Sequence, residues 1–157
     1  MQERLIKQAH NLLLHKKKTI AVAESCTGGS CCEFLTRYSG SSVYFLLGVT
    51  AYSNASKNMI LNIPLQIILK HGAVSQQTAA MMALSIRKLS HADIGIGITG
   101  IAGPTGAGLS KPVGTVFIAI DTGSRKICKR FLFRGSRATV RKKAALEALR
   151  LLCTTIR

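Results

Sequence analysis

The fold is decided by a stretch close to the N-terminus, which reads Thr19-Ile20-Ala21-Val22-Ala23-Glu24-Ser25-Cys26-Thr27-Gly28-Gly29. Its first part, Thr19–Ala23, predicts a short buried strand, and the two glycines let the backbone turn tightly and direct amide groups at a bound atom. A helix is expected to follow. Because ligands of open α/β sheets bind beyond the carboxyl ends of the strands, this strand end predicts a functional site at Ser25. An ordinary strand-to-helix turn with a Ser or Thr cap explains the local sequence equally well.

Length and composition indicate one domain that spans residues 1–157. The chain is long enough to bury a core, and 47% of its residues are hydrophobic against 18% charged. No apolar run is long enough to span a bilayer, and the N-terminus lacks the pattern of a signal peptide. We therefore expect a cytoplasmic protein without a membrane partner.

The strong positive charge raises the question of a nucleic-acid partner. Lys and Arg number 22 against 6 Asp and Glu, which gives a net charge of +16, and such a charge attracts polyanions. However, the basic residues are scattered without interleaved aromatics, and Trp is absent, so surfaces for base stacking are scarce. We therefore interpret the positive charge as a general property of the surface, which would also attract a small phosphorylated substrate.

The five cysteines do not predict a metal site or a disulfide framework. Their number is odd, and neither a C-x-x-C pair nor a His-bearing spacing typical of zinc is present. Reduced cytosolic thiols account for them more simply. Cys31 and Cys32 fall on the helix expected after Gly29 and are interpreted as small core residues.

Apolar periodicity and capping residues predict an alternation of helices and strands. The other helices are expected over Gln2–Lys16, Ser30–Tyr38, Pro64–Lys70, a segment capped by Ser75 with Ala79, Met82, Ala83, Ile86 and Leu89 on its apolar face, and Ser136–Thr155. Strands are expected from Asp93 onward and over Val113–Asp121 and Lys126–Phe133. The turn Asp121-Thr122-Gly123-Ser124 predicts that the last two strands form an antiparallel hairpin.

A second strand end carries polar residues of its own. The apolar run within Val43–Tyr52 predicts a buried strand that ends at Tyr52-Ser53-Asn54. A helix capped by Ser53 or Asn54 is expected next, with Lys57 in its first turn. The sequence therefore predicts two strand ends with functional residues.

A second concentration of glycines lies between Asp93 and Gly108. The spacing Gly95-x-Gly97-x-x-Gly100, with Asp121 downstream, formally matches a dinucleotide fingerprint. We reject this match because the fingerprint must open a helix, whereas these glycines lie inside a predicted strand, where they favour close approach of a helix or a ligand. The loop over Thr99–Lys111 is rich in amide donors and is suited to cradle a phosphate or to cover a site.

The residue types at the two strand ends suggest nucleophilic catalysis. All four histidines fall in predicted helices or at their ends, so a Ser-His-Asp triad is disfavoured. A lysine can serve as the base when burial lowers its pKa, and Lys57 is the lysine best placed to activate Ser25 for attack on an acyl carbon. Cys26 is the competing nucleophile, and we prefer Ser25. Backbone amides would supply the oxyanion hole near Thr27, Gly28 and Gly29.

Together these motifs resemble one family, and their order and spacing match it over nearly the whole chain. They are Ala23-Glu24-Ser25-Cys26-Thr27-Gly28-Gly29, Tyr52-Ser53-Asn54-x-x-Lys57, Gly72-Ala73-Val74-Ser75, Thr99-Gly100-Ile101-Ala102-Gly103-Pro104-x-Gly106, Lys111-Pro112-Val113-Gly114-Thr115-Val116 and Arg137-x-x-Val140-Arg141. The sequence thus resembles the CinA C-terminal-domain family in its stand-alone form. The resemblance implies an α/β fold, a three-layer α/β/α sandwich on a mixed, mostly parallel sheet.

The resemblance also implies an activity, the hydrolysis of the carboxamide of nicotinamide mononucleotide to nicotinate mononucleotide and ammonia. It implies Ser25 as nucleophile and Lys57 as base with Tyr52 nearby, and no metal or cofactor. Candidates for contacts with the substrate are Thr27, Gly28, Gly29, Asn54, Thr99, Gly100, Gly103, Arg137 and Arg141. We expect a homo-oligomer. The alternative is a non-catalytic basic domain associated with nucleic acid or competence.

The sequence departs from the family pattern in two places. Residues 76, 77, 81 and 82 are Gln, Gln, Met and Met, where family members usually carry acidic residues. The glycine-rich loop reads Gly106-Ala107-Gly108 instead of a plain Gly-Gly. These departures concern rate and substrate preference and leave Ser25 and Lys57 untouched.

Overall fold

A computed structural model describes residues 2–157 of the chain. Its five strands are β1 (Ile20–Glu24), β2 (Phe45–Thr50), β3 (Ile94–Gly100), β4 (Thr115–Asp121) and β5 (Lys126–Leu132). Its helices are α1 (Gln2–Lys16), α2 (Ser30–Thr36), α3 (Asn54–Leu61), α4 (Leu65–His71), α5 (Gln76–Ser90) and α6 (Arg137–Thr155), with a short 3₁₀ helix at Ser41–Val43. Among the described residues, no helix is both long and apolar enough to cross a membrane.

The strands form one sheet in the order β2-β1-β3-β4-β5. β1 pairs in parallel with β2 and β3, whereas the pairs β3–β4 and β4–β5 are antiparallel. Four of the five described strands therefore point the same way, and β4 alone is reversed. This arrangement confirms the predicted mixed, mostly parallel sheet and the hairpin formed by the last two strands.

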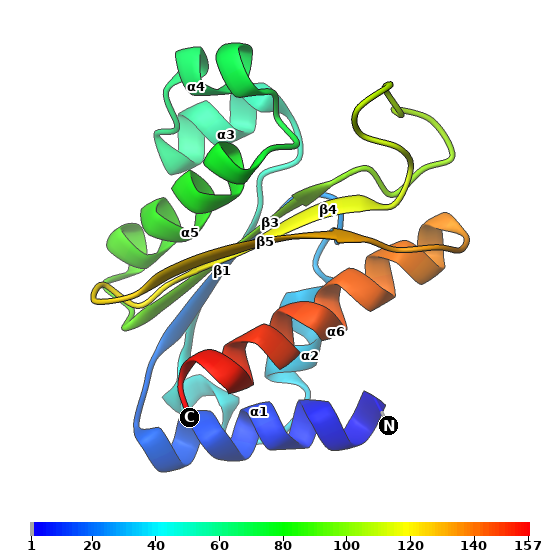
Figure 1. The fold of residues 1–157 in the computed structure, drawn as a ribbon. Coiled ribbons are helices and arrows are strands. Elements are labelled where there is room, and N and C mark those ends of the chain that lie inside the picture. Colours follow the sequence, from blue (N-terminus) through cyan, green and yellow to red (C-terminus); the bar gives the residue numbers. More distant parts are fainter. Residues whose placement is uncertain (1) are drawn as a thin grey trace.

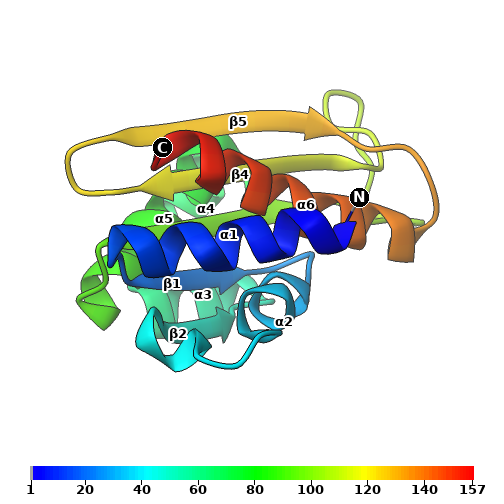
Figure 2. The same ribbon diagram turned by 90° about the horizontal axis from the view of Figure 1, so that it is seen from below.

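Helices cover both faces of the sheet, which confirms the three-layer architecture. Figure 1 shows α3, α4 and α5 above the sheet and α1, α2 and α6 below it. Seen from below, α1 lies across the outer side of its layer beside α6 (Figure 2). Each interface has its own apolar core, the larger one below the sheet and smaller clusters beneath α5. The carboxyl ends of β1, β2 and β3 meet at one edge of the sheet, which we call the site edge.

Two glycines of β3 allow α5 to lie unusually close to the sheet. A Cβ at Gly95 would overlap the carbonyl oxygen of Ala83, and one at Gly97 would overlap that of Ala79. Both glycines lie in the interior of the strand, so they serve helix packing. The rejection of the dinucleotide fingerprint is therefore correct.

Two sequence predictions about burial are wrong. The apolar run after Val43 does not form a strand buried on both faces, because β2 is an edge strand whose residues alternate in exposure, and Leu46 is 46% exposed. A run without polar interruptions cannot reveal that a strand lies at an edge. Leu89, predicted on the apolar face of α5, is half exposed, so the buried face of this helix ends at Ile86.

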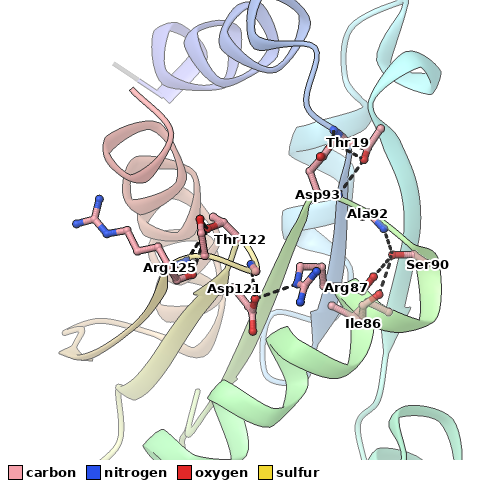
Figure 3. Close-up of polar contacts among 11 residues, drawn as sticks. Thr19, Ile86, Arg87, Ser90, Ala92, Asp93, Asp121, Thr122 and Arg125 are labelled. Carbon is pink, nitrogen blue, oxygen red and sulfur yellow. Dashed lines mark hydrogen bonds and ion pairs between the residues drawn. The ribbon is translucent and has the colours of Figure 1, made fainter.

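Ion pairs fasten the opposite edge of the sheet, which we call the paired edge and which Figure 3 shows in close-up. Arg87 on α5 donates from Nε to Oδ1 of Asp121 at 2.9 Å, and the Gly123 amide donates to the same oxygen at 2.7 Å. Asp93 accepts from the amide and the hydroxyl of Thr19 and from Lys18 Nζ. The contacts of Asp121 join α5 to the hairpin turn, and those of Asp93 join the start of β1 to the start of β3.

Candidate active site

The turn that carries Ser25 is held by the residue before it. Glu24 is fully buried at the end of β1, and its carboxylate accepts hydrogen bonds from the amides of Gly29, Cys31 and Cys32. These amides belong to the start of α2, where the helix dipole favours a negative charge. The turn itself requires the positive φ angles of Gly28 and Gly29. Glu24 thereby fixes Ser25 between a buried strand and a capped helix.

The second functional side chain comes from α3. Ser53 caps this helix and forms a reciprocal capping box with Ser56, so the expectation of a cap at Ser53 or Asn54 is met at Ser53. Lys57 then points inward and is only 1% exposed. Its Nζ lies 3.1 Å from Ser25 Oγ, 3.0 Å from the carbonyl oxygen of Ala51 and 3.1 Å from that of Tyr52.

The surroundings of Lys57 favour the neutral amine. Within residues 2–157 its Nζ has no carboxylate partner, and burial lowers its pKa, opposed only by the nearby Cys26 thiol. A neutral amine has two hydrogens and one lone pair. Two hydrogens match the carbonyl oxygens of Ala51 and Tyr52, which leaves the lone pair to accept the hydroxyl proton of Ser25.

Cys26 is a poor nucleophile in this position. It is buried beside Ser25, and burial raises the pKa of its thiol to about 12. The reactive form of a cysteine is the thiolate, so Cys26 stays protonated at neutral pH. The protonated thiol leaves Ser25 as the better nucleophile, independently of its contact with Lys57.

A cavity of about 290 Å³ opens over Ser25 and Lys57. Seven residues selected from the sequence line it, namely Ser25, Tyr52, Lys57, Thr99, Gly100, Gly103 and Arg137. The other lining residues are Cys26, Ala73, Val74, Ile101, Ala102, Thr105 and Gly106. The loop after β3 therefore covers the site, as its glycine content predicts.

Arg137 bridges the mouth of this cavity. From the first turn of α6 it donates to the carbonyl oxygen of Gly103 at 2.8 Å and to the hydroxyl of Tyr52 at 2.7 Å. It thus joins the covering loop to the segment before α3. Apart from Lys57, Arg137 is the one charged side chain among the described residues that line the cavity.

Three predictions about the turn after Ser25 are corrected by the geometry. The amide of Gly28 donates to the Ser25 carbonyl and that of Gly29 donates to Glu24, so neither is free for an oxyanion. Thr27 is fully buried and does not line the cavity. Local sequence indicated a flexible nest, but Glu24 and the turn itself use the two glycine amides.

Arg141 and Asn54 also lie outside the cavity. The Arg141 guanidinium donates from Nε and Nη2 to the carbonyl oxygen of Thr27, so it supports the turn from behind. It does not form a paired anion site with Arg137, although the two share a helix face. Asn54 is exposed at the first residue of α3.

Comparison with known proteins identifies the family. A family model described as the CinA C-terminal domain matches residues 2–156. The chain belongs to the CinA C-terminal domain family. A CinA-like protein of Syntrophus aciditrophicus is 48% identical over 90% of this chain, and a putative competence-damage inducible protein of Desulforudis audaxviator is 44% identical over 93%. The chain spans about a third of the length of these relatives, 34% and 35%.

Solved structures of the CinA superfamily share the fold over the whole chain. A competence/damage inducible protein of Agrobacterium tumefaciens superposes with a TM-score of 0.96 at 30% identity, covering 99% of this chain and 96% of that one. A competence damage-inducible protein A of Klebsiella pneumoniae gives a TM-score of 0.95 at 30% identity, with coverage of 99% and 96%. The CinA fold is thus present here in full.

Two residues that shape the site, Glu24 and Ala73, were not predicted from the sequence. Glu24 bears no catalytic pattern, although an acidic residue between a strand and a helix start is a recognisable capping signal. Ala73 belongs to the site because its carbonyl oxygen accepts a hydrogen bond from the Thr99 hydroxyl at 2.8 Å, a contact between distant segments.

The departures from the family pattern at Gln76 and Met81 lie in a groove between α5 and β5, away from Ser25. Within the described residues no cluster of potential metal ligands occurs.

Proposed function

We propose that this chain hydrolyses the carboxamide of nicotinamide mononucleotide to nicotinate mononucleotide and ammonia. The observation that carries the proposal is the 3.1 Å contact between Ser25 Oγ and the buried Nζ of Lys57. A serine next to a lysine whose pKa is lowered by burial is a nucleophile with its base and is suited to attack an acyl carbon. Membership of the CinA family supports the choice of this substrate.

The reaction proceeds through an ester on Ser25. The Oγ attacks the carboxamide carbon while its proton passes to Lys57 Nζ. When the tetrahedral intermediate collapses, the C–N bond breaks, and Lys57 returns the proton to the departing nitrogen, which leaves as ammonia. Water then gives a proton to Lys57 and attacks the ester, so that nicotinate mononucleotide is released and Ser25 is restored.

The oxyanion needs a donor that the turn has not already used. Because the amides of Gly28 and Gly29 are committed, we assign this role to the amide of Cys26, which lines the cavity next to the nucleophile. A donor aimed at the developing charge stabilises the transition state, and the loss of such a donor typically costs 10²–10³-fold in rate. The Cys26 side chain has no part in this step.

Arg137 and the covering loop are the proposed phosphate site. The guanidinium has donors beyond the two that bind Gly103 and Tyr52, and the loop contributes Thr105 and Gly106 to the same cavity. A phosphate there would lie at the mouth while the nicotinamide ring reaches Ser25. Nicotinamide riboside, which lacks the phosphate, should therefore have a KM at least tenfold higher, an order of magnitude typical of a lost charge-assisted contact.

Release of ammonia from nicotinamide mononucleotide tests the proposal. Wild-type protein should release one ammonia per nicotinate mononucleotide formed, and Ser25→Ala should release none above background. Ser42→Ala is the matched control, since Ser42 is exposed and remote from the cavity. An inactive wild type, or full activity in Ser25→Ala, would overturn the proposal.

The compartment and the assembly are part of this proposal. The five cysteines are free thiols, and Cys26, Cys31 and Cys153 are buried. Free thiols suit the reducing cytoplasm, where the pyridine nucleotides are also found. We propose a cytoplasmic homo-oligomer.

A further inference from the structure

The acidic side chains of this protein are all engaged in ion pairs or hydrogen bonds. Five of the six form ion pairs, namely Glu3, Glu33, Asp93, Asp121 and Glu147. The sixth, Glu24, is buried against backbone amides. Only four of the 22 Lys and Arg side chains take part in these pairs, so 18 have no acidic partner within residues 2–157. Most of the exposed Lys and Arg side chains in the described part of the chain therefore have no neighbouring carboxylate to offset their charge.

One hollow on the outer side of α1 gathers part of this charge. It measures about 720 Å³ and is lined by basic and amide side chains together with Leu12; the polar ones are Arg4, Lys7, Gln8, Asn11, His15 and Arg157. The spacing along α1 places all of them except Arg157 on one helix face, and Arg157 follows α6. From Arg4 to His15 the row extends about 16 Å at 1.5 Å per residue. We call this hollow the α1 groove.

The acidic residue closest in sequence to the groove is turned away from it. Glu3 accepts from Arg37 Nη1 at 2.9 Å and from the Tyr38 hydroxyl at 2.5 Å. The hydrogen bonds from Tyr38 and Arg37 lower the pKa of Glu3, so its charge is fixed toward α2. The α1 groove is thus lined by hydrogen-bond donors and cations, without an acidic side chain among the described residues.

We propose that the α1 groove binds the sugar-phosphate backbone of a nucleic-acid duplex without regard to sequence. Arg, Lys, Asn and Gln side chains are the usual partners of phosphate oxygens. No Phe, Tyr or Trp lines the groove, so it offers no platform for unstacked bases. Several phosphates fit along its length.

The same surface does not suit a membrane. A helix that lies in a lipid interface needs an apolar face to insert, but the apolar face of α1 is consumed by packing, with Ile6, Ala9 and Leu13 buried in the core. Leu12, the apolar residue of the groove, is itself half-buried. A polyanion that offers phosphates and no acyl chains is the better match.

This binding is separate from the proposed hydrolysis. α1 contributes no residue to the cavity over Ser25, and it lies beneath α6 and α2, on the far side of the sheet from α3 (Figures 1 and 2). Substitutions in the groove should therefore leave ammonia release unchanged. Ser25→Ala should in turn leave duplex binding unchanged, so the two proposals fail independently.

Fluorescence anisotropy with labelled 20-base-pair duplexes of DNA and of RNA tests the proposal across a series of KCl concentrations. The groove variant is Arg4→Glu with Lys7→Glu, two exposed positions in the first turns of α1 where Glu suits the helix. The control is Arg125→Glu with Lys126→Glu at the hairpin turn, which changes the net charge equally. Circular dichroism confirms that each variant is folded.

We expect the groove variant to bind either duplex at least tenfold more weakly at 0.1 M KCl. The slope of log K against log salt concentration should become shallower by about two, because each phosphate contact contributes about 0.9 to this slope. The control should lose less than about threefold. Equal losses in the two variants, no binding by the wild type, or tighter binding to phosphatidylserine vesicles than to duplexes would overturn the proposal. The ratio of DNA to RNA affinity decides which duplex is preferred.

Discussion

The two edges of the sheet give a basic side chain different partners: Arg87, which is 22% exposed, meets a buried carboxylate, whereas the buried Lys57 meets none within residues 2–157. At the paired edge, Arg87 meets the carboxylate of Asp121, which is only 2% exposed, and the hairpin amide of Gly123 completes the contact (Figure 3). At the site edge, Lys57 is 1% exposed and meets a hydroxyl and two carbonyl oxygens, with no carboxylate among the described residues.

Stability and chemistry are thereby separated between the two edges of one sheet. A carboxylate beside a buried cation keeps it charged, and such a pair tolerates no loss of one partner. Without the carboxylate, burial favours the neutral amine, which is the form that can accept a proton from Ser25. A carboxylate beside Lys57 would keep the amine charged and would remove the base.

Replacing Lys57 with Met should have the largest effect, and on activity alone. The amidase rate should fall by about 10³-fold, since general bases contribute 10²–10⁴-fold, while the free energy of unfolding at pH 7 should stay the same or increase because a buried amine is removed. Ammonia release and urea denaturation measure the two quantities. A variant that keeps a tenth of the activity would contradict the role of Lys57 as the base.

Replacing Arg87 with Met should reverse this pattern. Asp121 would remain buried without its partner, and the free energy of unfolding should fall by about 3 kcal/mol, at the lower end for a broken buried pair. The folded protein should keep its activity within about twofold, because Arg87 does not line the cavity. A denaturation midpoint equal to that of the wild type would show that the paired edge does not carry stability.

The pH dependence should follow the lowered pKa of Lys57. Below that pKa the amine is protonated, so kcat/KM should rise about tenfold per pH unit and then level off. Stability should rise in the next pH range, above the pKa of Lys57 in the folded protein and up to about 10.5. The unfolded chain holds the proton up to about 10.5, whereas the folded chain releases it earlier, so unfolding takes up a proton between the two pKa values. Lys57→Met should lack this rise in stability, and a parallel rise in the variant would refute the assignment.

The smallest effect should come from Lys18, on the exposed side of the paired edge. Its side chain is 51% exposed, and such surface pairs contribute little. Lys18→Met should change the free energy of unfolding by less than about 0.5 kcal/mol, because the amide and hydroxyl of Thr19 still donate to Asp93. Urea denaturation at two salt concentrations checks this, and a loss comparable to that of Arg87→Met would erase the distinction between buried and exposed pairs.

Local chemistry explains which parts of the fold follow from the sequence. The caps at Ser75 and Ser136 are present as predicted, because a side-chain oxygen three residues before an amide satisfies it wherever the helix lies. The close contact between Ser25 and Lys57 is also anticipated, since the carboxyl ends of adjacent parallel strands share an edge. Their roles in hydrolysis and the expected homo-oligomer stay predictions.

Contacts between distant segments explain what sequence reasoning missed. Arg137 and Arg141 are the same residue type and lie one turn apart on the same face of α6. Nevertheless, Arg141 binds Thr27 behind the turn, whereas Arg137 bridges the cavity mouth. Which partner each arginine binds depends on where α6 crosses the loops, and the sequence of α6 does not contain this information. The edge position of β2, which exposes Leu46, depends in the same way on strand order.

The sequence by itself determined the family, the alternation of helices and strands, and the two strand ends that carry Ser25 and Lys57. Periodicity and capping are local, and the order of motifs along the chain is enough to recognise them. Only the tertiary structure decided that Lys57 is buried without a carboxylate and that the amides of Gly28 and Gly29 are already used. The physical reason is that desolvation and hydrogen bonding depend on neighbours brought together by folding, and these set the protonation state on which the chemistry rests.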